Sequence, residues 1–113
     1  TRILAAIFGA TGVIAGAFGA HALKTMVSAD RLQIWQTASH YQQLHAIALL
    51  LLGLLPNTLW ASRLFTAGIL LFSGSLYLLV LLDQPGLGAV TPLGGLCFIL
   101  GWLSLLKKPV IPE

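Results

Sequence analysis

Four long apolar segments constrain this chain more than any other feature. They cover residues 3–23, 41–55, 64–82 and 91–106, with polar or turn-forming residues between them. Each approaches the ~20 residues that an α-helix needs to cross a bilayer. Unpaired backbone polar groups are costly in hydrocarbon, and a helix pairs them internally. The pattern therefore predicts an all-α integral membrane protein, a four-transmembrane-helix bundle forming one domain over residues 1–113.

Composition excludes the soluble alternative. Hydrophobic residues make up 58% of the chain and charged residues 8%, whereas soluble domains hold about 45–50% apolar and about 25% charged residues. The net charge of +3 comes from six basic and three acidic side chains spread along the sequence. A nucleic-acid-binding protein would carry a basic stripe. We therefore expect membrane lipids, other membrane-protein subunits or a second copy as partners, and no nucleic acid.

The second helix is expected to extend beyond its apolar run. Ser28 is a good N-cap residue and Asp30 places a favourable charge in the first turn, so a helix can begin at residue 29. Such a helix exceeds the hydrocarbon thickness. Residues 29–40 then either stand upright or lie flat in the interface, with Trp35 and Tyr41 at the headgroup level. The sequence leaves both arrangements open.

Basic residues near the segment ends predict the orientation. The side with both termini would carry Arg2, Arg63, Lys107 and Lys108. The other side would carry Lys24 and Arg31. Cytoplasmic loops are enriched in Lys and Arg. The count predicts a multi-pass protein of the inner (cytoplasmic) membrane with both termini in the cytoplasm.

Seven residues are candidates for a polar pocket in the membrane. They are His21, Tyr41, Gln42, His45, Ser73, Tyr77 and Thr91. All are expected in the half of the bilayer away from the termini, and polar groups in a bilayer usually face the bundle interior. On the third segment, Thr66, Leu70, Ser73 and Tyr77 form the stripe expected to point inward. On the second, Gln36, His40 and Gln43 are expected to point to water or headgroups.

Glycines are the candidate packing residues, because small residues let helices approach closely in lipid. The set is Gly9, Gly12, Gly16, Gly19, Gly74, Gly94 and Gly95. The single cysteine, Cys97, lies inside an apolar run and allows no disulfide framework.

The polar residues leave several chemistries open. His21 and His45 could face each other and ligate haem b, which needs two axial ligands at matched depth. They could instead be neutral and hydrogen-bonded across helices, or help to hold a lipid headgroup or a quinone. A metal site would need three or four ligands and is not expected. No carboxylate lies inside a segment to complete a catalytic triad, so no catalytic residue, no enzyme activity and no cofactor is predicted.

Four motifs together resemble a known family. They are Gly16–His21 (Gly-Ala-Phe-Gly-Ala-His), Tyr41–Ala46 (Tyr-Gln-Gln-Leu-His-Ala), Leu71–Tyr77 (Leu-Phe-Ser-Gly-Ser-Leu-Tyr) and Thr91–Gly95 (Thr-Pro-Leu-Gly-Gly). The chain is similar in these to the YgdD/YwdK-type small inner-membrane proteins, a bacterial family of unknown function. The resemblance implies a four-helix membrane protein of the bacterial inner membrane and carries no activity or ligand.

Three functions are compatible with these observations. The leading hypothesis is a structural or accessory subunit of a larger membrane complex, because the chain is small, rich in glycine and poor in catalytic groups. The alternative is a stand-alone protein that binds or transports a lipid, quinone or other small molecule in its polar pocket. The third hypothesis is a haem-carrying electron-transfer subunit.

Overall fold

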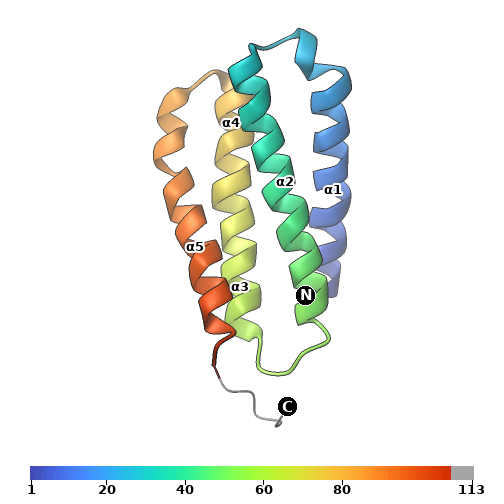
Figure 1. The fold of residues 1–113 in the computed structure, drawn as a ribbon, viewed down its shortest axis with the longest axis vertical. Coiled ribbons are helices and arrows are strands. Elements are labelled where there is room, and N and C mark those ends of the chain that lie inside the picture. Colours follow the sequence, from blue (N-terminus) through green and yellow to red (C-terminus); the bar gives the residue numbers. More distant parts are fainter. Residues whose placement is uncertain (108–113) are drawn as a thin grey trace.

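The computed structural model describes residues 1–107, which form four helical rods packed side by side (Figure 1). Helices α1 (Arg2–His21), α2 (Ala29–Leu52) and α5 (Thr91–Ser104) each form one rod. The third rod joins α3 (Leu59–Gly68), a π-helical segment (Ile69–Ser73) and α4 (Gly74–Leu82). Short 3-10 turns at Leu23–Thr25 and Pro85–Ala89 complete two of the connections.

The rods alternate in direction. α1 and the third rod run the same way, and α2 and α5 run back, so the two ends of the described chain lie at the same end of the bundle (Figure 1). α2 packs on α1 along its length and on the third rod with its other flank, while α5 covers the third rod. α2 is therefore an interior element of the bundle.

α2 begins where the sequence allows and runs without a break beside α1. The hydroxyl of Ser28 accepts a hydrogen bond from the backbone N–H of Arg31 at 3.2 Å, and Asp30 lies in the first turn. Trp35 is 5% exposed because it packs inside the bundle. Its expected position at the headgroup level stays a prediction. Tyr41 comes halfway along this 24-residue helix rather than near its start.

Three rods are long and apolar enough to cross a membrane. Within residues 1–107 these candidate spans are Arg2–Thr25, Leu59–Leu82 and Pro85–Ser104. Large apolar side chains are exposed on every rod, including Ile14 at 66%, Leu82 at 59% and Leu103 at 54%, far more than a soluble protein leaves in water. α2 has the length but carries a polar face, so its crossing stays a prediction.

The π-helical segment turns the third rod. Each π turn holds more residues than an α turn, so side chains beyond it change face. Ile69 and Ser73 are buried, while Leu70 is 61% exposed. The expected inward stripe is therefore wrong at Leu70, because an α-helical register was assumed through this segment.

Two apolar clusters form the core. The larger one joins all four rods and contains Ala5, Ala48, Leu49, Leu52, Ala61, Phe65, Ile69 and Phe98. The smaller one, near the first loop, contains Leu23, Trp35 and Val80.

Glycines on α1 let α2 approach closely. A Cβ at Gly12 would lie 2.9 Å from Cγ of Gln43, and one at Gly19 would lie 2.7 Å from Cδ1 of Trp35. Gly16 faces the hydroxyl of Ser39, at 3.0 Å from such a Cβ, and Gly9 faces Ala46 at 4.0 Å. Side chains at Gly12, Gly16 or Gly19 would thus displace the α2 side chains that pack there.

The third rod and α5 meet through a second set of glycines. A Cβ at Gly94 would lie 2.7 Å from Cα of Phe72, in the π-helical segment, whereas one at Gly95 would lie 3.9 Å from Cδ2 of Phe72. Gly68 and Gly101 make similarly close approaches to Phe98 and Phe65. A Cβ at Gly74 would meet nothing within 4 Å, which corrects its assignment as a packing glycine.

This contrast predicts opposite effects of two Gly→Ala substitutions. Gly94→Ala should destabilise the protein by about 1–3 kcal/mol, because the methyl group meets backbone that cannot move aside. Gly74→Ala should be neutral or stabilising by up to about 1 kcal/mol, because alanine favours a helix over glycine. Thermal unfolding in detergent, followed by circular dichroism, measures both. Equal midpoints for the two variants would contradict the packing described here.

Candidate functional site

Polar side chains on α2 bind the backbone of α1. Nε1 of Trp35 donates to the carbonyl of Ala15 at 2.7 Å, and the hydroxyl of Ser39 donates to that of Gly12 at 2.9 Å. Nε2 of Gln43 donates to the same Gly12 carbonyl at 3.1 Å. Each carbonyl oxygen has a second lone pair free to accept such a bond. Gln43 therefore faces α1, which corrects the expectation that it points to water or headgroups.

Gln42 connects three rods. Its Nε2 donates to the carbonyl of Phe8 at 2.9 Å and to the hydroxyl of Thr11 at 2.7 Å, both on α1. Its Oε1 accepts from the hydroxyl of Tyr77, on α4, at 2.7 Å. Ser73 adds a bond from the third rod to α2, donating to the carbonyl of Ala38 at 2.7 Å. The amide of Gln42 is thus bonded at both ends within a buried position.

An arginine fastens α2 to the end of α4. Nη2 of Arg31 donates to the carbonyl of Val80, in the last turn of α4. Nε of Arg31 lies 3.7 Å from Oδ1 of Asp83, whose left-handed backbone (φ 52°) ends that helix. A cation at a helix C-terminus is favoured by the carbonyl dipoles. Arg31 therefore joins the two rods near the loops away from the termini.

His45 uses both of its ring nitrogens. Nδ1 lies 2.8 Å from the carbonyl of Tyr41, and Nε2 lies 3.1 Å from the indole Nε1 of Trp102 on α5. A carbonyl can only accept and an indole N–H can only donate. His45 is therefore the neutral tautomer with its proton on Nδ1. Its ring stacks on that of Phe98 with 3.7 Å between centroids.

An aromatic cluster surrounds this histidine. Phe65 meets the His45 ring edge-on at 5.1 Å between centroids, and the Tyr41 ring lies 4.8 Å from that of Phe72. His45 is 2% exposed. A ligand that took Nε2 of His45 would have to displace the Trp102 N–H from this packed position.

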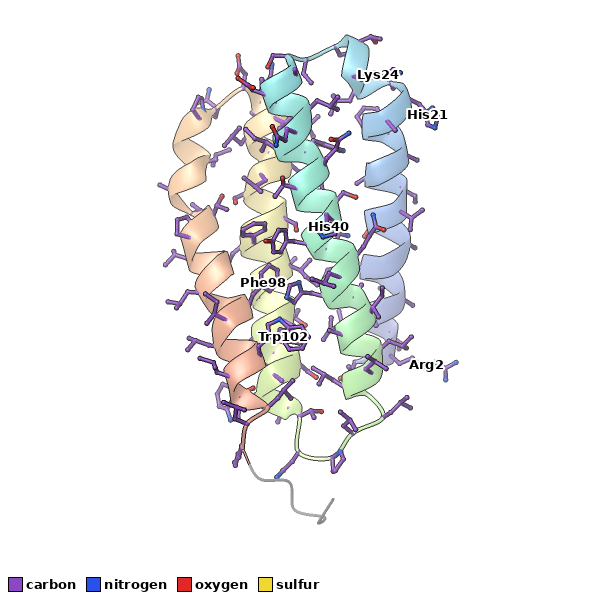
Figure 2. All side chains as sticks on the ribbon, viewed as in Figure 1. Arg2, His21, Lys24, His40, Phe98 and Trp102 are labelled. Atoms are coloured by element: carbon purple, nitrogen blue, oxygen red, sulfur yellow. The ribbon has the colours of Figure 1, made fainter. Side chains whose placement is uncertain are left out.

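The structure does not bring the two candidate histidines together. His45 is adjacent to Ala46, which faces Gly9 on α1, and His21 lies twelve residues further along α1, about 18 Å along the helix axis. His21 is exposed at the end of α1, while Phe98, the stacking partner of His45, lies in the half of the bundle nearer the termini (Figure 2). The pair does not offer the matched depth that a shared haem requires.

The other candidates are spread along the bundle. The hydroxyl of Thr91 shares a hydrogen bond with that of Ser75 at 2.6 Å, where α5 begins. Gln42 and Tyr77 are bonded to each other, and Tyr41 is partly exposed beside Phe72. The seven candidates therefore do not gather at one place in the bundle, because α2 begins at residue 29 and carries Tyr41 to His45 to its middle. Their position in one half of the bilayer stays a prediction.

Sequence reasoning missed several members of the network. Ser39, Gln43 and Arg31 bind backbone carbonyls, which no sequence pattern marks. Trp102 carried a usable signal, because an indole N–H inside a membrane needs an acceptor. Among residues 1–107, no group of three or more His, Cys, Asp or Glu side chains is placed to hold a metal ion.

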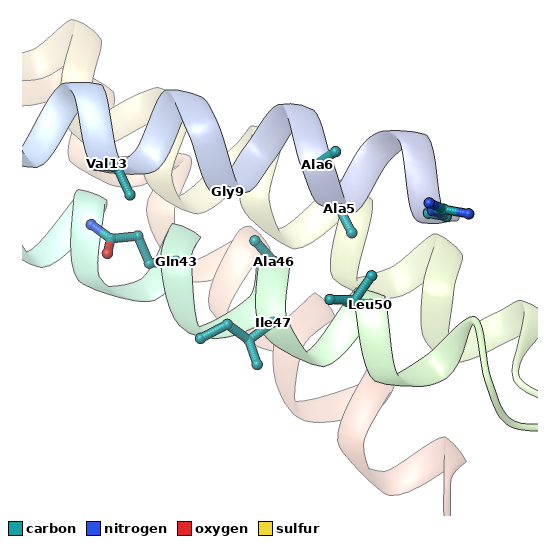
Figure 3. Close-up of a pocket in the computed structure, with 9 residues that line it drawn as sticks. Ala5, Ala6, Gly9, Val13, Gln43, Ala46, Ile47 and Leu50 are labelled. Carbon is teal, nitrogen blue, oxygen red and sulfur yellow. The ribbon is translucent and has the colours of Figure 1, made fainter.

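An apolar groove runs along the outside of α1 and α2 (Figure 3). Its volume is about 320 Å³. It is lined by Arg2, Ala5, Ala6, Gly9, Val13, Gln43, Ala46, Ile47 and Leu50. Arg2 lies at the end near the termini and Gln43 at the inner end, so the groove follows the direction of a membrane lipid chain.

The Gln42–Tyr77 bond predicts a measurable coupling energy. In a double-mutant cycle, Gln42→Leu and Tyr77→Phe should couple by about 0.6 kcal/mol and by no more than about 1.7 kcal/mol, the range found between membrane helices. Gln42→Leu with Thr91→Val should be additive within about 0.5 kcal/mol, because these residues share no partner. Unfolding in mixed detergent micelles measures both cycles. Equal coupling in the two would contradict a direct bond.

The His45 contacts predict one tautomer. In ¹⁵N spectra of the labelled protein, Nδ1 of His45 should carry the proton and Nε2 should not. The reason is that Nδ1 faces a carbonyl, which can only accept, and Nε2 faces an indole N–H, which can only donate. Trp102→Phe should leave the Nδ1 proton in place and shift the Nε2 resonance. A proton on Nε2 in the unsubstituted protein would show that the Trp102 bond is absent.

Comparison with known proteins places the chain in a family. Residues 15–95 match the family model described as protein of unknown function (DUF423). A UPF0382 membrane protein of Staphylococcus aureus is 45% identical over 109 residues, covering 92% of this chain and 89% of the relative. Those of Staphylococcus saprophyticus and Staphylococcus haemolyticus are 43% and 42% identical over the same length. No solved structure matches. The narrower resemblance to the YgdD/YwdK type stays a prediction, but this chain belongs to the DUF423 family of membrane proteins of unknown function.

Proposed function

We propose that this protein is a non-catalytic accessory subunit of a membrane-protein assembly, anchored by four spans and docked through the outer face of α2. The observation that carries the proposal is a row of residues on that face, which we call the outer seam. It consists of Gln33, Gln36, His40, Leu44, Ile47 and Leu51. All six side chains are exposed on the outside of the bundle.

The half of the outer seam toward the first loop is polar, and in a four-span arrangement part of it lies in the hydrocarbon region of the bilayer. His40 is the twelfth residue of the 24-residue α2, and it lies at mid-height in the bundle (Figure 2). Gln36 is one turn away, about 6 Å along the axis. Polar groups facing hydrocarbon are unfavourable, and they usually mark a protein interior or a cavity. A covering transmembrane helix with donors and acceptors would satisfy them.

The topology supports four spans. α1 and the third rod run in the same direction (Figure 1), so a chain that crosses the membrane with both must cross back between them. α2 is that return segment. Its inner polar groups bind neighbouring rods, which lowers the cost of placing them in lipid.

The basic residues support cytoplasmic termini in a bacterial inner membrane. Arg2 lies at the end of the bundle where the described chain begins and Lys24 at the other end (Figure 2). Arg63, near the start of α3, and Lys107, just after α5, lie toward the end that holds Arg2. Arg31 is joined to Val80 and Asp83. Lys108, also counted in the prediction, lies outside the described residues.

The interior favours assembly over ligand chemistry. Gln42, Tyr77, His45 and Ser73 all have hydrogen-bond partners within the bundle. A bound haem or quinone would have to replace these bonds, so the proposal includes no cofactor and no catalytic residue. The haem alternative is further weakened by the different depths of His21 and His45.

A second candidate function rests on the groove between α1 and α2. Its apolar walls suit an acyl chain, and Arg2 at its outer end suits a lipid phosphate. This would make the protein a lipid-binding protein, with the site outside the bundle rather than in the polar network.

Native mass spectrometry of the tagged protein, extracted gently from its own membranes, tests the proposal. We expect a defined assembly of fixed stoichiometry, larger than the 12.0 kDa chain. The variant Gln33→Leu, Gln36→Leu, His40→Leu should lose it, because its seam offers no hydrogen bonds. The matched control Leu78→Ala, Leu81→Ala, Leu82→Ala, on the exposed side of α4, should retain it. A monomer with a constant lipid mass would instead support the second candidate.

A further inference from the structure

The outer seam has the spacing that helices use to pair. Its six residues follow one another at intervals of three or four, which keeps them on one line along α2. The half toward the first loop is polar and neutral, with Gln33, Gln36 and His40. The other half is apolar, with Leu44 at 46%, Ile47 at 61% and Leu51 at 56% exposure. A matching helix needs the same polarity at the same depth.

A second copy of α2 meets that requirement. In a two-fold dimer with its axis along the membrane normal, each residue meets its own equivalent at equal depth. The side-chain amide of glutamine and a neutral imidazole each carry both a donor and an acceptor, so each can pair with its own kind. A charged residue would repel its equivalent, and the outer seam contains none.

The surroundings of the seam fit the same partner. The nearest cation, Arg31, is joined to Val80 and Asp83 on the third rod rather than directed along the seam. On the α1 side, the seam borders the apolar groove, because Ile47 belongs to both (Figure 3). Side chains at Leu44 and Leu51 of a second copy would find space beside Ile47 and Leu50.

We propose that the outer seam of α2 is a homodimer interface, with Gln36 and His40 hydrogen-bonded to their equivalents in a second copy of this chain. This inference rests on the proposed function and deepens it, because it identifies a second copy of this chain as the partner that binds the outer seam.

Disulfide cross-linking in native membranes tests the geometry. In a Cys97→Ala background, His40→Cys and Ile47→Cys should each give a product of twice the chain mass on oxidation, because equivalent residues on a two-fold axis lie within disulfide reach. Leu78→Cys, 48% exposed on α4, should give none. Absence of the dimer at both seam positions would overturn the interface.

A photo-reactive benzophenone side chain at Ile47 separates this inference from the proposed function. A product of twice the chain mass supports a second copy. A product with a different protein overturns the second copy and leaves the proposed accessory role standing. Products with lipid alone overturn both, since the seam would then face the bilayer.

Substitution separates hydrogen bonding from simple apolar packing. Gln36→Leu with His40→Leu should weaken dimerisation about tenfold, because two pairs of interhelical hydrogen bonds are lost and lipid supplies no compensating hydrophobic effect. His40→Gln alone should retain the dimer, since glutamine keeps a donor and an acceptor. Both variants should fold like the parent, because the bonds of Gln42 and His45 are untouched. Dimerisation unchanged or strengthened by the leucines would overturn the inference.

Discussion

The hydrogen bonds that α2 sends into its neighbours are the constraint on which the bundle depends. α2 is the least apolar of the four rods, and a helix with this many amides and hydroxyls is poorly suited to stand alone in hydrocarbon. Placing it between α1 and the third rod lets Ser39 and Gln43 bond to α1, and lets Gln42 bond to α1 and Tyr77 together. The position of α2 in the bundle follows from its polarity rather than from its apolar surface.

The glycines of α1 are the counterpart of that constraint. The side chains of α2 bind backbone carbonyls of α1, and they reach these oxygens only because Gly12 and Gly16 leave the helix surface open. A close approach also occurs between α5 and the third rod, where Gly94 lies against the backbone of Phe72 in the π-helical segment. The polar residues of α2 and the glycines of α1 therefore act together in packing these two helices.

Sequence alone predicts the elements well and the direction in which their side chains face poorly. Apolar length and the Ser28 cap locate the rods, because both depend on local residues. The outward turn of Leu70 could not be predicted, since it depends on the π-helical segment. Gln43 and Gln36 are chemically the same residue on one helix, yet one bonds to Gly12 and the other is exposed. Only the position of α1 distinguishes them.

That distinction also bears on the proposed function. Interhelical hydrogen bonds in membranes average only about 0.6 kcal/mol each. The inner network therefore determines the rotational position of α2 more than it adds to the free energy of unfolding. It fixes which face of α2 turns inward, and thereby which polar residues are left outside. Had α2 been rotated about its axis by one residue, about 100°, the line of Gln36, His40 and Ile47 would have turned away from the outside of the bundle. The interior bonds of Gln42 and His45 therefore keep the outer seam exposed on the outside of the bundle. The proposed assembly role depends on this buried network even though no partner contacts it.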